Sequence, residues 1–296
     1  MTSVAVIAHR DKRLDGGLPE LRSTLSANGV SDPIWYEVPK SAKAPKCVRQ
    51  ALKKGADLLF VWGGDGMVQQ CIDAAAGSGV PIAILPAGTA NLLATNLGIP
   101  KHLPEAVAVG LHGGRRAIDV GVLNGERFVV MAGAGLDGRI MGGVSKSSKA
   151  HLGRLAYFRS SARAIKAASR DVCVKVDGEV WFDGKASCVL LGNVGTVTGG
   201  LCVFPEASPD DGQLEVGVVT AKKGLDWLRV LARVVTHDPD KSPLVHMTRG
   251  RKITAVFDRP MLSEIDGGER DKVKKLKVRV EPRSVEICVP EQAAAS

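Results

Sequence analysis

The sequence predicts an α/β domain followed by an all-β domain. In the first part of the chain, short apolar runs alternate with helical patterns, which is typical of a doubly wound, mostly parallel sheet. Two of these runs end in glycine-rich turns, at 63–66 and 86–91. Further on, short segments of alternating polarity predict an antiparallel β-sandwich. We expect domains at 1–121 and 122–296, and a last strand at about 284–290 that can return to the first domain.

The elements of the first domain follow in regular order. The expected strands are short and apolar, at 4–8, 34–38, 57–62 and 80–85. The expected helices lie between or after them, at 18–27, 45–54, 68–76, 92–97 and 104–111. Glycines close several of these helices, as helix C-termini favour. Because ligands of such sheets bind beyond the carboxyl ends of the strands, both glycine-rich turns lie where a ligand is expected.

The second domain is predicted to be mainly strands. They are expected at 128–132, 172–176, 188–191, 214–219, 253–257, 275–280 and 285–289. Asp177-Gly178 predicts a tight hairpin after the second of them. Helices are expected at 152–168 and 225–235, the latter with an apolar stripe that should pack on the sandwich.

Composition limits the function classes. The formal net charge of +9 favours anionic partners, but aromatic residues are only 4% of the chain, which argues against stacking-based nucleic-acid binding. The six cysteines show no C-x-x-C spacing, so zinc and dithiol chemistry are not indicated and a reducing, cytoplasmic location is expected. No apolar stretch approaches the roughly 18 residues of a membrane span, so any membrane contact should be peripheral.

The first glycine-rich turn has the chemistry of a phosphate site. Gly63, Gly64 and Gly66 let an anion approach the backbone amides at the start of a helix. Asp65 repels phosphate, so it could hold Mg²⁺, bind a ribose or brace the loop. The alternative is an ordinary tight turn in which Asp65 caps the helix.

The second turn offers further donors. Gly88 exposes the backbone, and the hydroxyl and amide of Thr89 can bind phosphate at a helix start. Thr89 or Asn91 could instead simply cap the following helix.

Several motifs in order resemble one family. They are GGDG at 63–66, PAGTAN at 86–91, DVGVLNG at 119–125, GAGLD at 133–137, LGRLAY at 152–157, GN at 192–193, GG at 199–200, PEASPDDGQL at 205–214 and DGGE at 266–269. Together they are similar to the bacterial diacylglycerol kinase and lipid kinase family, whose catalytic domain is related to that of sphingosine kinases. A lone GGDG is less specific, because NAD kinases and phosphofructokinases carry similar turns.

The resemblance implies an ATP-dependent lipid kinase whose first domain is NAD-kinase/phosphofructokinase-like. ATP would lie between the domains, with Mg²⁺, against residues 63–67, Gly88, Thr89 and Asn91. A neutral lipid would bind in the β domain, and conversion of diacylglycerol to phosphatidic acid is the default reaction of phospholipid biosynthesis. A sphingoid-base or ceramide kinase, an NAD kinase and a non-catalytic nucleotide- or lipid-binding regulator are the alternatives.

The resemblance also assigns a base and a second metal site. Asp266 is preferred as the base that accepts the lipid proton and Glu269 comes second, although Asp-Gly-Gly also favours a plain hairpin turn. A structural Mg²⁺ would be held by Asp211 with carbonyls of Ser208 and Gln213, or the segment is only a turn.

The chain departs from the family at several positions. Met67 stands where the family usually has a Thr, and Leu92 stands where it often has an Asp. The segment 9–13 replaces the family's usual turn after the first strand. These departures put the nucleotide contacts and the activity in question. Basic residues cluster in two zones, which are either solvated faces or contacts to an anionic membrane surface. These residues are Lys146, Lys149, Arg154, Arg159, Arg163, Lys166 and Arg170, then Lys272, Lys274, Lys275, Lys277 and Arg279. The oligomeric state is open, and a homodimer is one alternative.

Overall fold

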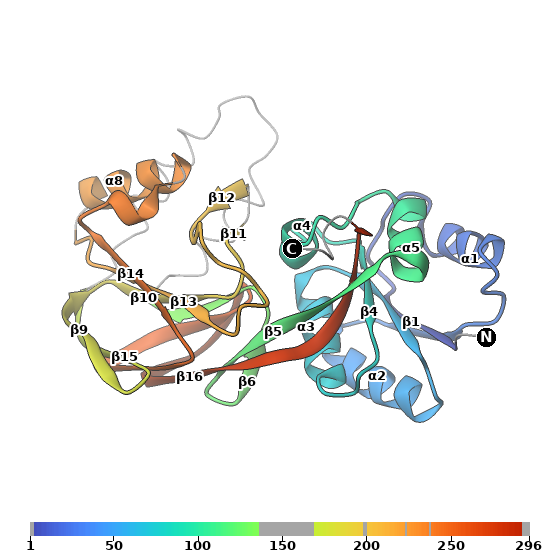
Figure 1. Ribbon diagram of the computed structural model, residues 1–296, viewed down its shortest axis with the longest axis horizontal. Helices are drawn as coiled ribbons and strands as arrows, with labels where there is room; N and C mark the ends of the chain where they lie inside the picture. Colours follow the sequence, from blue (N-terminus) through green and yellow to red (C-terminus); the bar gives the residue numbers. More distant parts are fainter. Residues whose placement is uncertain (1–2, 136–168, 198–199, 223, 237, 292–296) are drawn as a thin grey trace. The chain divides into compact units, whose positions relative to one another are not determined.

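The protein is described by a computed structural model that covers residues 3–135, 169–197, 200–222, 224–236 and 238–291 (Figure 1). It forms two compact units, Met1–Asp119 with Arg283–Ser296, and Val120–Pro282. Among the described helices, none has the length and apolar character needed to cross a membrane.

The first unit is built on a parallel sheet. Its strands lie in the order β2 (Ile34–Val38), β1 (Val4–His9), β3 (Leu58–Gly63), β4 (Ile82–Pro86) and the end of β16 (Gly268–Val289). The register pairs Gly63 with Pro86, so both glycine-rich turns leave the sheet at the same edge. β1, β3 and β4 are buried along almost their whole length because helices cover both of their faces, whereas the edge strand β2 is mostly half-buried.

Two pairs of helices make these layers. α1 (Gly17–Ala27) and α5 (Leu103–His112) cover one face, and α2 (Ala44–Lys53) and α3 (Asp65–Ala75) the other (Figure 1). On the first face, Leu21 and Leu103 pack with Phe60 and Trp62 of β3. A 3₁₀ turn, Ser41–Lys43, precedes α2, and the short α4 (Leu92–Asn96) follows the second glycine-rich turn. The expected doubly wound sheet is confirmed.

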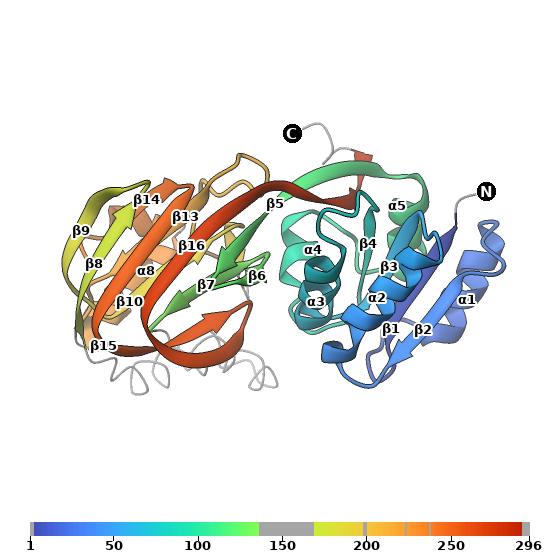
Figure 2. The same cartoon turned by 90° about the horizontal axis from the view of Figure 1, so that it is seen from below.

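The second unit is an antiparallel β-sandwich, also as expected. One layer has the order β14-β13-β10-β7, and the other contains β9, β8, β15 and β16 side by side, from yellow β9 to red β16 in Figure 2. The strands are β5 (Gly114–Leu123), β6 (Glu126–Phe128), β7 (Met131–Ala134), β8 (Arg170–Val176), β9 (Glu179–Ala186), β10 (Cys188–Gly192), β11 (Thr196–Val197), β12 (Leu201–Cys202), β13 (Leu214–Val219), β14 (Val245–Gly250) and β15 (Lys252–Ile265).

Strand β15 connects the two layers. Its first half pairs with β8 and β16, and its end, 263–265, pairs with β7. The register shifts between Val256 and Met261, where Pro260 cannot donate to a ladder, and such bulges bend strands. The apolar core lies between the layers and includes Phe128 and Phe257.

Helix α8 (Gly224–Val235) covers the outer face of the β10 and β13 layer. Trp227 and Val230 pack against Cys188 and Val219, whereas Leu225 is 71% exposed. A 3₁₀ turn, Pro239–Lys241, follows α8.

Three local expectations differ from the structure. The strands expected at 275–280 and 285–289 are one strand, β16, which starts antiparallel to β15 and ends with Ile287 parallel to Ile82. The strand expected at 128–132 is interrupted between β6 and β7. The helix expected at 152–168, and the basic zone that reaches it from 146, lie outside the described residues apart from Arg170.

Candidate functional site

The two glycine-rich turns touch each other through their backbones. A Cβ atom built on Gly64 would lie 3.1 Å from Cα of Gly88, and one built on Gly88 would lie 2.3 Å from Cα of Gly64. Real Cβ atoms do not approach backbone so closely, so only glycine fits at position 88. The turns therefore form one rigid rim at the carboxyl edge of the sheet.

Side chains of Asp65 and Asn91 lock this rim. The Asp65 carboxylate accepts the N–H groups of Asn91 at 2.9 Å and Leu92 at 2.5 Å. The buried Asn91 accepts the Gly88 N–H at 2.9 Å and donates to the carbonyls of Pro86 and Gly88, at 3.0 and 2.8 Å. Of the roles considered for Asp65, bracing the loop is the one that these contacts make.

The rim leaves donors for an anion. The N–H groups of Asp65 and Gly66, the first two of α3, donate to no described protein atom. Gly66 and Thr89 are exposed. A phosphate that reached this rim would meet amides and the positive end of α3.

Met67 lies below the rim. Its side chain is 1% exposed, and its N–H donates to the Gly64 carbonyl at 2.8 Å. A Cβ atom on Gly63 would lie 2.5 Å from Cβ of Met67, so Gly63 makes room for this side chain. The contacts of Met67 and Gly63 are those of packing, and their predicted role toward a nucleotide stays a prediction.

A third turn, 9–13, lies at the same edge and was noted in the sequence only as a departure from the family. Ala8 of β1 pairs with Trp62 of β3, and the Trp62 Nε1 donates to the Lys12 carbonyl at 3.2 Å. Arg10, Lys12 and Arg13 are exposed there. They add positive charge to an edge that already presents amides.

In the second unit, Asp266 organises the interruption between β6 and β7. Its carboxylate accepts three backbone N–H groups, of Val129, Val130 and Met131, each at 2.9 Å. Its own N–H donates to the Met131 carbonyl at 2.8 Å. Asp266 and Gly267 have φ of 45° and 79°, which closes a two-residue hairpin between Ile265 and Gly268.

Glu269 lies in the same hairpin with different surroundings. It is exposed and pairs across the hairpin with Glu264. The next residue, Arg270, is fixed by the Glu126 carboxylate, with Nε at 2.8 Å from Oε2, and this hydrogen bond raises the pKa of the guanidinium. The hairpin therefore presents one carboxylate held by the backbone and one that is open to solvent.

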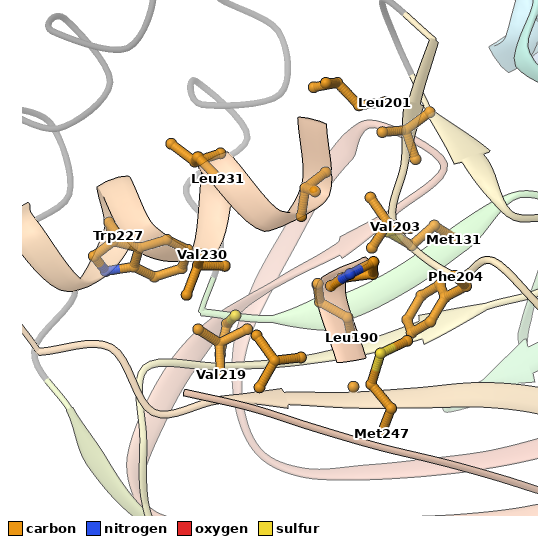
Figure 3. Close-up of a pocket in the computed structure, with 16 residues that line it drawn as sticks. Met131, Leu190, Leu201, Val203, Phe204, Val219, Trp227, Val230, Leu231 and Met247 are labelled. Carbon is orange, nitrogen blue, oxygen red and sulfur yellow. The ribbon is translucent and has the colours of Figure 1, made fainter. Parts of the chain in front are cut away.

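An apolar cavity of about 90 Å³ lies between α8 and the β10 and β13 layer (Figure 3). Trp227, Val230 and Leu231 of α8 face Leu190 and Val219 of the sheet across it. The other lining residues are Met131, Cys188, Val197, Leu201, Val203, Phe204, Gly217, Val234, Pro239, Val245 and Met247. Burial raises the pKa of the Cys188 thiol to about 12, so this lining is uncharged at neutral pH.

The expected structural metal site is a turn with oxygen donors. Asp211 accepts the Gln213 N–H at 2.8 Å, and the Ser208 hydroxyl donates to Asp210 at 2.7 Å. Within the described residues, no cluster of three or more His, Cys, Asp or Glu side chains could hold a metal. One carboxylate oxygen of Asp211 with backbone carbonyls and water fits Mg²⁺ chemically, and the site stays a prediction.

Beside this turn is a polar pocket of about 410 Å³. Glu206, Glu215, Asp238, Asp240 and Arg249 line it. Burial raises the pKa of Glu215; Arg249 lowers it and the neighbouring carboxylates raise it further. The net direction is upward, so the folded protein binds the proton of the Glu215 carboxyl more tightly than the unfolded chain does.

The comparisons with known proteins agree with this geometry. Residues 11–123 match the diacylglycerol kinase catalytic domain, and residues 130–289 match the YegS C-terminal NAD kinase beta sandwich-like domain. The second match alone spans more than half of the chain. The chain belongs to this family of lipid kinases.

Two of the matched relatives align with this chain over most of both lengths, and a third is matched over little more than half of its length. The probable lipid kinase YegS-like of Enterobacter sp. (strain 638) is 27% identical over 283 residues, which are 92% of this chain and 91% of the relative. That of Yersinia pestis (strain Pestoides F) is 28% identical, over 84% of this chain and 88% of the relative. The match to uncharacterized protein sll0036 of Synechocystis sp. is 26% identical and covers 80% of this chain, which spans only 56% of that protein.

Solved structures show the same fold. One crystal structure of a protein from Bacillus anthracis str. Sterne has a TM-score of 0.81 at 22% identity, over 98% of this chain and 96% of its own. A second, named a diacylglycerol kinase, has a TM-score of 0.73 at 19% identity, over 98% of both chains. An NAD kinase from Archaeoglobus fulgidus in complex with ATP has a TM-score of 0.54 at 11% identity, over 99% of this chain and 96% of its own. At these identities the structures establish the fold alone.

A substitution at the contact of the two turns should loosen the rim. We expect Gly88→Ala to lower the free energy of unfolding by about 1–3 kcal/mol, because its Cβ would overlap the Gly64 backbone. Gly66→Ala is the matched control, since nothing lies within 4 Å of its Cβ and helix propensity favours Ala. Chemical denaturation measures both, and equal stability of the two variants would contradict a rigid contact.

The raised pKa of Glu215 predicts a pH-dependent stability change. The folded state binds this proton more tightly than the unfolded state does. The ionised carboxylate therefore lowers the free energy of unfolding by its full amount above the folded pKa, and has no such effect below the unfolded pKa of about 4.5. Glu215→Gln should therefore raise the melting temperature at pH 7, and the gain should shrink as the pH falls through that window. A variant that is less stable at pH 7 would show that the Arg249 contact outweighs burial.

Proposed function

We propose that this lipid kinase transfers the γ-phosphoryl group of ATP to the hydroxyl of a neutral lipid, with diacylglycerol as the acceptor and phosphatidic acid as the product. One residue carries the proposal. Met131 lines the apolar cavity with its side chain, and its N–H binds the Asp266 carboxylate. The apolar cavity and the hairpin that carries both candidate general bases thus meet at Met131.

The chemistry needs charge neutralisation and a proton acceptor. The lipid oxygen attacks the γ-phosphorus, the bond to the ADP oxygen breaks, and the hydroxyl proton passes to a carboxylate. The amides at the rim and Thr89 would hold the phosphates, with Arg10, Lys12 and Arg13 adding positive charge at that edge. Mg²⁺ bound with ATP would supply further charge neutralisation.

The contacts change the preferred base. A carboxylate has about four acceptor positions, and the backbone N–H groups at 129–131 fill three of those on Asp266. Glu269 is exposed and follows in the same hairpin. We therefore propose Glu269 as the base and Asp266 as the residue that positions the β6–β7 backbone, with Asp266 as base the alternative.

The cavity suits part of an acyl chain. Dry apolar cavities of this order bind small apolar molecules, and about 90 Å³ holds a few methylene groups. A longer chain would need α8 to shift outward. This favours a lipid substrate over a soluble nucleotide, whose polar groups would lose their hydrogen bonds in such a lining.

Two substitutions distinguish the roles of the hairpin carboxylates. We expect Glu269→Gln to lower kcat by about 10²–10⁴-fold with little change in melting temperature, because general bases contribute that much. Asp266→Asn should lower the melting temperature as well, since its amide nitrogen cannot accept the backbone N–H groups. Phosphorylation of diacylglycerol in detergent micelles and thermal melts measure both effects.

The outcomes separate the assignments. Full turnover in Glu269→Gln, together with loss of turnover in a folded Asp266→Asn, would return the base to Asp266. Full turnover in both variants would show that the chemistry takes place elsewhere.

Filling the cavity tests the lipid site. Val230→Phe should raise KM for long-chain diacylglycerol more than for a short-chain analogue, because the added ring would occupy the space of methylene groups. Leu225→Phe, on the exposed side of the same helix, is the control and should change neither KM. An equal effect of both variants on KM would place the acyl chain outside this cavity.

A further inference from the structure

The outer face of the second sandwich layer is basic. Its residues follow from the register: Lys277, Thr254, Lys175 and Val180 form one row across β16, β15, β8 and β9. On one side of this row Lys275 lies opposite Val256, and on its other side Lys252 lies opposite Arg279, which is ion-paired with Glu281. We call Lys175, Lys252, Lys275, Lys277, Thr254, Val180 and Val256 the basic sheet face.

The four lysines are exposed and their ammonium groups are not held in ion pairs. None of them forms an ion pair with any described residue, although Lys185, Arg127, Arg270 and Arg279 of the same unit each pair with a carboxylate. Backbones two strands apart are separated by about 10 Å, close to the screening length of physiological salt, so Lys175 and Lys277 repel each other. Two acids lie at the border of the basic sheet face: Asp183 is at the β9 end of the Lys275 row, and the Asp177 carboxylate accepts the Lys252 N–H at 2.8 Å.

The face also exposes large apolar side chains between the charges. Val180 is 56% and Val256 is 45% exposed, and only Leu225 accompanies them as a large exposed hydrophobic among the described residues. Both valines lie directly across from a lysine on a neighbouring strand, Val180 from Lys175 and Val256 from Lys275. A face exposed only to water is not stabilised by alternating lysines and valines, because the lysines repel each other and the apolar valine side chains remain hydrated.

We propose that the basic sheet face docks on an anionic lipid bilayer. The lysines would meet lipid phosphates and the valines would enter the headgroup region. Charge complementarity argues for this partner, since each basic side chain near such a surface contributes about 1 kcal/mol, a roughly fivefold change in affinity.

Nucleic acid is the other polyanion that this charge could attract. The face offers no exposed aromatic side chain for base stacking, because Trp181 and Phe182 of β9 pack toward the sandwich core. Aliphatic side chains between cations suit a bilayer better than a phosphodiester backbone.

Vesicle sedimentation tests the proposal. The intact chain should bind vesicles of mixed phosphatidylcholine and phosphatidylglycerol, should not bind phosphatidylcholine alone, and should dissociate as salt is raised. The triple variant Lys175→Gln, Lys275→Gln, Lys277→Gln should bind about 100-fold more weakly. Val180→Ser with Val256→Ser should weaken the binding that persists at high salt.

A matched control removes the same charge from the other unit. Lys46, Lys53 and Lys101 are exposed there, and changing all three to Gln should leave vesicle binding nearly unchanged. Equal losses in both triple variants, wild-type binding by the face variant, or tighter binding to duplex DNA than to anionic vesicles would each overturn the proposal. The readout is independent of catalysis, because Glu269→Gln should bind vesicles like the unmodified chain even if the proposed reaction is wrong.

Discussion

The backbone contact between Gly64 and Gly88 is the constraint on which the arrangement of the two glycine-rich turns depends. Parallel strands alone would bring two turns to one edge, but they would not fix the turns against each other. Glycine at both positions removes the Cβ atoms, and Asp65 and Asn91 then tie the backbones together. The carboxylate of Asp65 therefore holds the two turns together, and the amides at the start of α3 remain available for a ligand.

Asp266 uses the same device in the second unit. A carboxylate that accepts several amides holds a backbone segment in a conformation without a regular ladder, here between β6 and β7. This fixes Met131, which begins β7 and lines the apolar cavity. A residue type that the family motif associates with catalysis can thus be retained for positioning, and its substitution must be interpreted together with stability.

Local signals explain what the sequence predicted. Both glycine-rich turns and the hairpin at Asp177-Gly178 are encoded by adjacent residues, and Asp177 and Gly178 do adopt positive φ. The partners of Asp266 are more than a hundred residues away, so no local pattern could reveal them. Strand β9 was not among the expected strands because Trp181 is an extra residue between the paired Val180 and Phe182, and this bulge interrupts the alternation of β9. β16 was predicted as two strands because Pro282 resembles a break, yet the strand continues through it and Arg283 takes a φ of 48°.

The same register argument separates core from surface in the second sandwich layer. In β15, Ile253, Ala255 and Phe257 enter the core, so Lys252, Thr254 and Val256 must point outward. The same face carries one ion pair, Lys185–Asp171, at the far end of β8 and β9. The cross-strand neighbours of Lys175, Lys275 and Lys277 are Thr or Val, and that of Lys252 is Arg279, so no acid lies directly opposite any of the four lysines. A surface with that composition would be stabilised by an external layer of anions, which the proposed docking on an anionic bilayer would supply.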